Sequence, residues 1–436
     1  MTLLADLLTT VFDRRDRFSW RSKPGDRPLP DLAAELVAAE GEVTGLTIAQ
    51  QLLAGYREAD DATRLAFFRF LAQEMTISPD AIRQALAAYE QGQSKASYRA
   101  YMEAAEPPRQ ELIRRLNRVP GATRTLVRMR MDLLRLGGDD DAIQALDLDF
   151  RHLFASWFNR GFLVLRPISW ESPAHILEKI IAYEAVHAIN SWDDLRDRLE
   201  PADRRCFAFF HPAMPDEPLI FVEVALTRGI PGTIHEVLTD QRPRLFPEDA
   251  DTAVFYSISN CQQGLAGISF GNSLIKQVAS DLAHDWPGLK TFVTLSPIPG
   301  LVRWLDTQGI APLSGDGLRE QAARYLLQAR RPDGQPVDPV ARFHLGNGAR
   351  ILHLHADADL SDKGLAQSAG AMVNYHYDFD TVTQNHEGYA TRHQIAASSE
   401  IRGLAAAAEK ADKAAQTART ARQPKSDKTP DDKTTA

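Results

Sequence analysis

The chain contains 436 residues, of which 44% are hydrophobic and 25% charged, and its formal net charge is −8. It is too long for one ordinary hydrophobic core, so two or three domains are expected. The average composition excludes a disordered or fibrous chain. The negative charge argues against nucleic acid or an anionic membrane as a partner of the whole chain. Two cysteines, Cys206 and Cys261, are too few for a disulfide framework.

The first residues, MTLLADLLTTVFDRRDRF, have an apolar face interrupted by acids and arginines, and no signal-peptide cleavage site follows them. They predict a first helix of the mature protein. No stretch approaches the roughly 18 uninterrupted apolar residues that a membrane span requires. A cytoplasmic location is therefore expected.

Residues 31 to about 136 carry apolar side chains three and four positions apart, which is typical of amphipathic helices. Ser78-Pro79 is a helix start signal, and Gly137-Gly138 is a helix end signal. The pattern predicts a helical domain over residues 1–160. Its last part is predicted to be a helix that leads into a short strand.

After about residue 160, runs rich in Val, Ile, Phe and Tyr alternate with helical patterns. A capped amphipathic helix is predicted over residues 271–288. This order predicts an α/β or α+β domain with a central mixed sheet. The predicted strands are RCFAFFHP, PLIFVEVALT, DTAVFYSIS, KTFVTLSPIPG and ARILHLHAD.

The run TFVTLSPIPG raises a question about its serine, Ser296. Pro297 and Pro299 are unsuited to ladder pairing or to a helix, so a rigid turn is predicted directly after the strand. Such a turn would fix Ser296 at the open end of the sheet. By local sequence alone, Ser296 is either a turn residue or a side chain held toward a substrate.

Residues 254–278, VFYSISNCQQGLAGISFGNSLIKQV, contain a strand end, three glycines and a helix start near Asn272 or Ser273. Free backbone N–H groups and the positive end of a helix would converge there, which is one way to hold a pyrophosphate. The block matches neither the dinucleotide fingerprint nor the Walker loop. Close packing of a helix on a strand explains the glycines equally well.

Five blocks occur in order: HPAMPDEPLIFVEVALT, FYSIS with QQGLAGISFGNSLIKQV, LSPIPG, FHLGNGA and VNYHY. Together they make the chain similar to malonyl-CoA decarboxylases, up to about residue 405. The resemblance implies an all-helical N-terminal domain, 1–160, followed by a GNAT-type acyltransferase-like domain with a central mixed β-sheet, 161–405. It also implies a homo-oligomer, a dimer or tetramer, assembled through the helical domain. Residues 406–436 lie outside it, and their alanine- and lysine-rich composition predicts a fraying helix and then disorder.

The resemblance further implies site residues. The serine of LSPIPG is Ser296, the histidine of FHLGNGA is His344, and the second tyrosine of NYHY is Tyr377, the three places used by the family's proposed active site. A glutamate that some members carry in the glycine-rich block is replaced by Ser269. The loop that would hold the pyrophosphate of coenzyme A consists of Gln262, Gln263, Gly264, Leu265, Ala266 and Gly267.

The implied reaction converts malonyl-CoA to acetyl-CoA and CO2, within fatty acid metabolism. Loss of CO2 leaves an enolate whose charge lies mainly on the thioester oxygen, so hydrogen-bond donors fixed at that oxygen lower the barrier. Ser296 and His344 are suitable donors. His344, with an unperturbed pKa near neutrality, could also return a proton to C2, directly or through water, assisted by Tyr377. The thioester itself delocalises the charge, so no metal or prosthetic group is expected.

Two other functions use the same features. A GNAT-type acyltransferase would need an acceptor amine and a base, and a non-catalytic sensor of CoA thioesters would leave Ser296 and His344 unused. A metal site is conceivable in HLHADADLSDKG, although its glycine comes two places too late for a calcium loop. The arginines of RRLNRVPGATRTLVRMRMD are expected to form a solvated or interface face. The residues that would share one strand face at the conceivable metal site are His353, His355, Asp357 and Asp359.

Overall fold

The computed structural model describes residues 27–239, 241–242, 244–268 and 274–422, except for the side chains of Leu274 and residues 412–422. The predictions for the first helix, for Ser269 and for the end of the tail lie outside these residues. The chain divides into two compact units. One combines the chain up to Phe158 with Gln262–Ile268, and the other combines Asn159–Cys261 with the chain from Ser269 onward.

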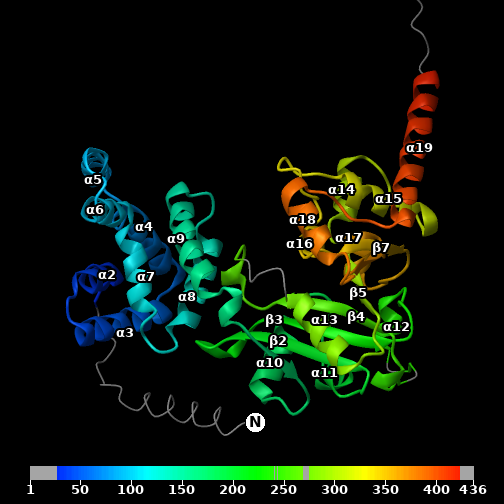
Figure 1. Cartoon of the computed structure of the whole chain (residues 1–436), viewed down its shortest axis with the longest axis horizontal. Helices are drawn as coiled ribbons and strands as arrows, with labels where there is room; N and C mark the ends of the chain where they lie inside the picture. The colour runs from blue at the N-terminus through cyan, green and yellow to red at the C-terminus, as the bar shows by residue number, and fades with distance from the viewer. Residues whose placement is uncertain (1–26, 240, 243, 269–273, 423–436) are drawn as a thin grey trace, which may run out of the picture. The chain divides into compact units, whose positions relative to one another are not determined.

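The first unit is helical over the residues described, as predicted (Figure 1). The side chain of Ser78 accepts a hydrogen bond from the N–H of Ala81 (3.3 Å), and Gly137 caps the helix that ends at Leu136, so both boundary signals are confirmed. The helices are α2 (Leu29–Ala38), α3 (Glu42–Glu58), α4 (Asp61–Gln73), α5 (Pro79–Gln91), α6 (Lys95–Ala105), α7 (Pro108–Leu116), α8 (Ala122–Leu136) and α9 (Asp141–Trp157). The short 3-10 turn η4 (Gln263–Leu265) packs against α8.

Helices α5 and α6 differ from the other helices of this unit because neither contains a buried residue. They pack against each other, with the rings of Tyr89 and Tyr101 stacked at 6.4 Å between centroids. Leu86, Tyr98 and Met102 are exposed. Figure 1 shows the pair extending from the end of α4.

The second unit contains a mixed sheet, whose strands follow the order β1-β2-β3-β4-β5-β8-β6, with β7 also paired to β8. Neighbouring strands are antiparallel except β4 and β5, which are parallel. A helical region followed by a mixed-sheet domain confirms the predicted fold class. The strands are β1 (Val164–Ile168), β2 (Arg204–His211), β3 (Met214–Thr227), β4 (Thr252–Asn260), β5 (Thr291–Thr294), β6 (Ser296–Pro297), β7 (Arg350–His355) and β8 (Met372–His376).

The two faces of the sheet are both covered because apolar side chains of the strands alternate in direction. Val222 and Val224 belong to the large core that includes α13, whereas Phe221 packs with α10 and α11. The helices of this unit are α10 (Ala174–Tyr183), α11 (Trp192–Leu199), α12 (Ile234–Leu238), α13 (Leu274–Asp285), α14 (Leu301–Thr307), α15 (Gly315–Gln328), α16 (Pro339–Gly346), α17 (Asp362–Ser368), α18 (Val382–Arg392) and α19 (Ser399–Arg422), with 3-10 turns η2 (Arg160–Phe162) and η3 (Pro247–Asp249).

One sequence expectation needs correction. Pro297 was expected to prevent pairing, but Ser296 and Pro297 pair with Val373 and Met372. The pairing is possible because β6 is the last strand in the order, and an edge strand tolerates proline. The helix predicted at the start of the tail is present, because α19 continues to Arg422 and packs on α15, and its alanines favour a helix.

Candidate active site

Ser296 lies where two parallel strands part. Strands β4 and β5 pair only from Thr252–Thr291 to Phe255–Thr294. At this level β4 contains a bulge or irregularity opposite Glu223 and Val224, a feature that often redirects a strand beside a functional site. Beyond it, the chain after β5 leaves β4 and pairs with β8 instead.

The hydroxyl of Ser296 makes two hydrogen bonds inside the protein. Its Oγ donates to Thr294 Oγ1 (2.8 Å) and lies 3.3 Å from His344 Nε2. The residue is 6% exposed, so it is buried rather than presented at an open edge. The structure therefore brings Ser296 and His344 together, although they are 48 positions apart in the chain.

His344 lies on α16, not at a strand boundary. Asp338 caps this helix by accepting a hydrogen bond from the N–H of Ala341 (2.8 Å), and Pro339 occupies its first turn. The imidazole ring stacks on Tyr375, with centroids 4.4 Å apart and planes at 21°. These contacts hold the ring so that its second nitrogen, Nδ1, faces Tyr377.

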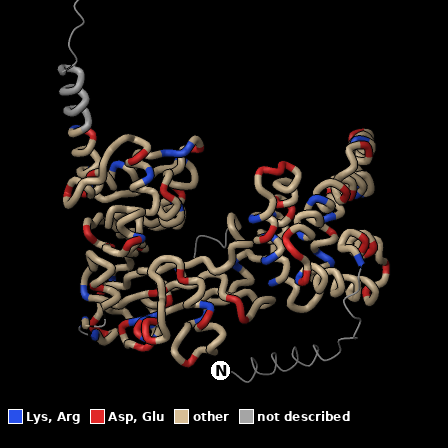
Figure 2. Tube along the Cα trace, turned by 180° about the vertical axis from the view of Figure 1, so that it is seen from behind, with Lys and Arg blue, Asp and Glu red and all other residues tan. Residues whose placement is uncertain are grey.

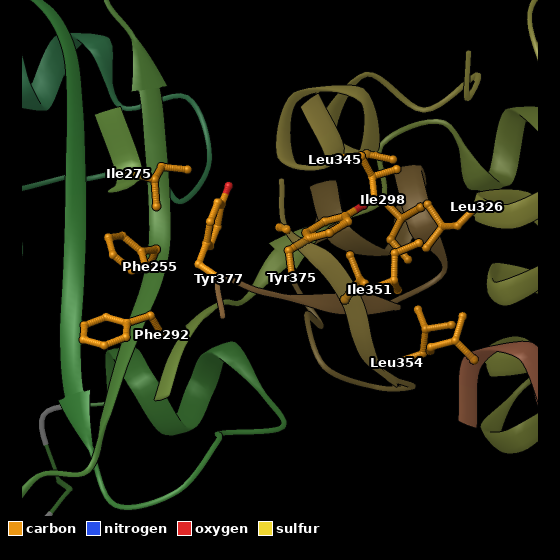
Figure 3. Close-up of a cluster of buried hydrophobic side chains, with 14 of the residues drawn as sticks. Phe255, Ile275, Phe292, Ile298, Leu326, Leu345, Ile351, Leu354, Tyr375 and Tyr377 are labelled. Carbon is orange, nitrogen blue, oxygen red and sulfur yellow. The ribbon is translucent and has the colours of Figure 1, made fainter. Parts of the chain in front are cut away.

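Tyr377 completes the predicted set of three residues. Its hydroxyl lies 2.8 Å from His344 Nδ1, and its side chain is 1% exposed. Figure 3 shows its ring beside Phe255 and Ile275, within the buried hydrophobic cluster that also contains Tyr375. Ser296, His344 and Tyr377 thus form one hydrogen-bonded chain.

Burial determines the protonation states of His344 and Tyr377. It lowers the pKa of His344 to about 3, so the imidazole is neutral at physiological pH. It raises the pKa of Tyr377 well above its usual value, so the phenol keeps its proton. The expectation of a His344 pKa near neutrality is therefore wrong, because the sequence did not reveal that the ring is completely buried.

Thr294 and Asn374 belong to the same polar network, and sequence reasoning missed both. Thr294 Oγ1 also accepts a hydrogen bond from the N–H of Tyr375 (3.1 Å), and the Thr294 carbonyl accepts one from Asn374 Nδ2 (2.7 Å). Both side chains are fully buried. The available signal was a threonine two positions before Ser296, on the same side of the strand.

The glycine-rich loop belongs to the helical unit. The guanidinium of Arg130 donates hydrogen bonds to the carbonyls of Gly264 (2.8 Å) and Ala266 (2.9 Å). A Cβ at Gly264 would lie 1.9 Å from the Val127 carbonyl oxygen, so this position requires glycine for close packing on α8. Arg130 is 2% exposed, so the expectation of a solvated or interface face is wrong for this arginine of the segment.

Arg151 is a second basic residue at this loop. Its guanidinium lies 3.7 Å from the position that a Cβ would take at Gly267. Gly267 has a φ of +74°, a left-handed conformation that favours glycine. The side chain of Arg151 is exposed. It is therefore available to an anion in a way that the buried Arg130 is not.

The histidine and aspartate pattern of residues 353–359 does not share one strand face. Strand β7 ends at His355, and Asp357 adopts a φ of 53° beyond it. His353 bonds to Glu400 (2.7 Å), and His355 bonds to Asn374 (2.6 Å). Both histidines line a cavity of about 660 Å³ whose lining does not include Ser296, His344 or Tyr377.

The fold class is a helical unit followed by a mixed-sheet unit, and the mixed-sheet unit contains the buried Ser–His–Tyr chain. Family comparison identifies the class more closely. The malonyl-CoA decarboxylase C-terminal domain matches residues 161–316 and 310–416, and the N-terminal domain matches residues 76–158. The chain belongs to the malonyl-CoA decarboxylase family of enzymes.

Known relatives agree with this assignment. The mitochondrial malonyl-CoA decarboxylase of Anser anser anser is 34% identical over 348 residues, which cover 68% of this chain and 69% of that protein. The malonyl-CoA decarboxylase structure from Rhodopseudomonas palustris is 47% identical, with a TM-score of 0.81, and covers 86% of this chain and 98% of its own. The one from Agrobacterium vitis is 48% identical, with a TM-score of 0.81 and coverages of 87% and 99%.

Proposed function

We propose that this chain converts malonyl-CoA to acetyl-CoA and CO2, with Ser296, His344 and Tyr377 as its catalytic residues, on a sheet of the GNAT acyltransferase type. The observation that carries the proposal is the hydrogen-bonded chain from Ser296 Oγ through both nitrogens of His344 to Tyr377. Family membership supports the reaction, and this geometry supports the choice of residues.

In the proposed reaction, the bond between C2 and the carboxylate breaks, CO2 leaves, and the electron pair passes into a thioester enolate. The thioester oxygen then carries most of the negative charge. The N–H of a neutral His344 imidazole, and the Ser296 hydroxyl once it turns from Thr294 toward the substrate, stabilise this oxygen by donating hydrogen bonds, and each such donor typically contributes on the order of 2.7 to 4 kcal/mol. C2 then takes a proton from water, because a neutral His344 has no imidazolium proton to give. The hydroxide that remains is neutralised by the solvent or combines with the released CO2 as bicarbonate.

Coenzyme A enters as part of the substrate, and the proposal includes no metal and no prosthetic group. The loop Gln262–Gly267 is proposed to bind its pyrophosphate. Hydrogen bonds from the buried Arg130 hold the backbone of the loop, and the exposed Arg151 beside Gly267 supplies positive charge. The sequence suggested only backbone N–H groups as ligands of the pyrophosphate, and the proposal adds the side chain of Arg151.

The test is formation of CO2 and acetyl-CoA from malonyl-CoA by purified, chelator-treated protein. Ser296→Ala and His344→Ala are expected to lower kcat at least about a hundredfold each. Ser314→Ala and His284→Ala, which change exposed residues of the same types, serve as matched controls. Turnover that survives both active-site substitutions would refute the site but keep the reaction. CoA release only with an amine acceptor would favour an acyltransferase, and binding without turnover would favour a sensor.

We also propose a homo-oligomer, a dimer or tetramer, that acts in the cytoplasm within fatty acid metabolism. The unburied helices α5 and α6 support assembly through the helical unit. No helix among the described residues is long and apolar enough to cross a membrane. Some of the relatives are named mitochondrial, so localisation in an organelle is the alternative. Immunolocalisation in the source cells would distinguish the two locations.

A further inference from the structure

Thr294 is the nearest hydrogen-bond partner of the Ser296 hydroxyl. Its Oγ1 receives the Ser296 O–H at 2.8 Å and the N–H of Tyr375 at 3.1 Å. The Thr294 carbonyl accepts a hydrogen bond from Asn374 Nδ2, so the backbone of Thr294 is also hydrogen-bonded to β8. Thr294 is 0% exposed, so bulk water does not compete for these hydrogen bonds.

The direction of the hydrogen bond from Ser296 to Thr294 assigns the hydrogens of the contacts that follow it. Ser296 has a single hydroxyl hydrogen, and that hydrogen goes to Thr294. At the contact between Ser296 and His344, the donor must then be His344 Nε2–H. A neutral imidazole has only one N–H, so Nδ1 is bare and accepts the hydrogen of the Tyr377 hydroxyl at 2.8 Å.

We propose that Thr294 is a positioning residue that determines the tautomer of His344. By taking the Ser296 hydrogen, it leaves Ser296 Oγ as an acceptor and so places the imidazole hydrogen on Nε2. That hydrogen is then aimed at the Ser296 side of the ring, where the proposed function requires a donor for the thioester oxygen. The inference deepens the proposed function, but the proton arrangement stands independently of it.

The opposite tautomer follows if Thr294 loses its hydroxyl. In Thr294→Val, the Ser296 hydrogen has His344 Nε2 as its remaining acceptor. The imidazole hydrogen then moves to Nδ1 and is donated to Tyr377 Oη. The enzyme loses the Nε2–H donor before substrate arrives, whereas Thr294→Ser keeps a hydroxyl at the same place.

The test is ¹⁵N NMR of protein labelled at histidine, recorded without substrate near neutral pH. The His344 signals are assigned as those lost in His344→Gln. The parent is expected to show a protonated Nε2 and a bare Nδ1, Thr294→Ser is expected to match it, and Thr294→Val is expected to show the reverse. Thr291→Val, at the start of the same strand, is the matched control. If the valine variant does not fold, the spectrum of the parent still shows which nitrogen of His344 carries the hydrogen.

A kinetic measurement accompanies the spectra. Thr294→Val is expected to lower kcat at least about a hundredfold with KM little changed, since the Nε2–H donor to the thioester oxygen is lost from the transition state, and Thr294→Ser is expected to restore the parent value. A parent with hydrogen on Nδ1, or a valine variant with the parent's tautomer, would overturn the inference. Parent protein with the expected tautomer but no turnover would support the inference and reject the proposed function.

Discussion

His344 makes the stability of the folded chain depend on pH. Burial lowers its folded pKa to about 3, whereas the unfolded value is near the ordinary 6.5. Between these values the unfolded chain binds a proton that the folded chain does not. The contribution of His344 to the free energy of unfolding therefore rises with pH across this window and is constant above it.

The measurement is denaturant unfolding of the parent and of His344→Gln from pH 5 to 8. The difference in unfolding free energy between the two proteins is expected to increase up to about pH 6.5 and then level off. Asp338 and Glu223, whose pKa values burial raises to about 6 and about 7, act in the opposite direction, but both proteins contain them. A difference that is constant over this range would contradict a neutral, buried His344.

The change in unfolding free energy when a glycine is replaced by alanine depends on the space around the new methyl group, as two glycines show. Gly264→Ala would force a Cβ to within 1.9 Å of the Val127 carbonyl on α8. It is expected to lower the free energy of unfolding by about 1 to 3 kcal/mol. Gly403→Ala, on α19 with no atom within 4 Å of the new Cβ, is the control and is expected to gain about 0.5 to 1 kcal/mol. Urea unfolding measures both, and equal effects would contradict the close packing of η4 on α8.

The turn η4 also permits a test of anion binding. Arg151→Ala is expected to raise KM for malonyl-CoA about tenfold, because a charged hydrogen bond to the pyrophosphate is lost, and to leave kcat nearly unchanged. Arg83→Ala removes an arginine of the same unit that is 73% exposed and serves as the control. An unchanged KM, measured at low and high salt, would exclude Arg151 from substrate binding.

Acidic and basic residues are interspersed along the described part of both units (Figure 2), so charge alone does not select a surface for assembly. The proposed assembly surface is instead formed by the exposed apolar side chains of α5 and α6. Changing Leu86 and Met102 together to Glu is expected to shift the protein to a smaller species in light scattering after size exclusion. Val43→Glu, at a residue 81% exposed on α3, is the matched control. Unchanged mass in the double variant would place the interface elsewhere.

The sequence predicted the elements whose causes are local. The helical unit follows from apolar spacing, the start of α5 from Ser78-Pro79, and most strands from runs of β-branched and aromatic residues. Strand β8 was not predicted as a strand. Its central residues are buried on both sides, and Asn374 lies inside, so the alternation of a half-exposed strand is missing.

What the sequence by itself determined was the order of elements and, through five motif blocks, the family and its three candidate residues. The tertiary structure alone decided that His344 contacts both Ser296 and Tyr377, that burial keeps His344 neutral, and that Thr294 accepts the serine hydrogen. It also decided that the glycine loop packs on α8 through Arg130, 134 positions before Gly264. Burial and hydrogen-bond direction depend on residues distant in the chain, and no local pattern of residue types records them.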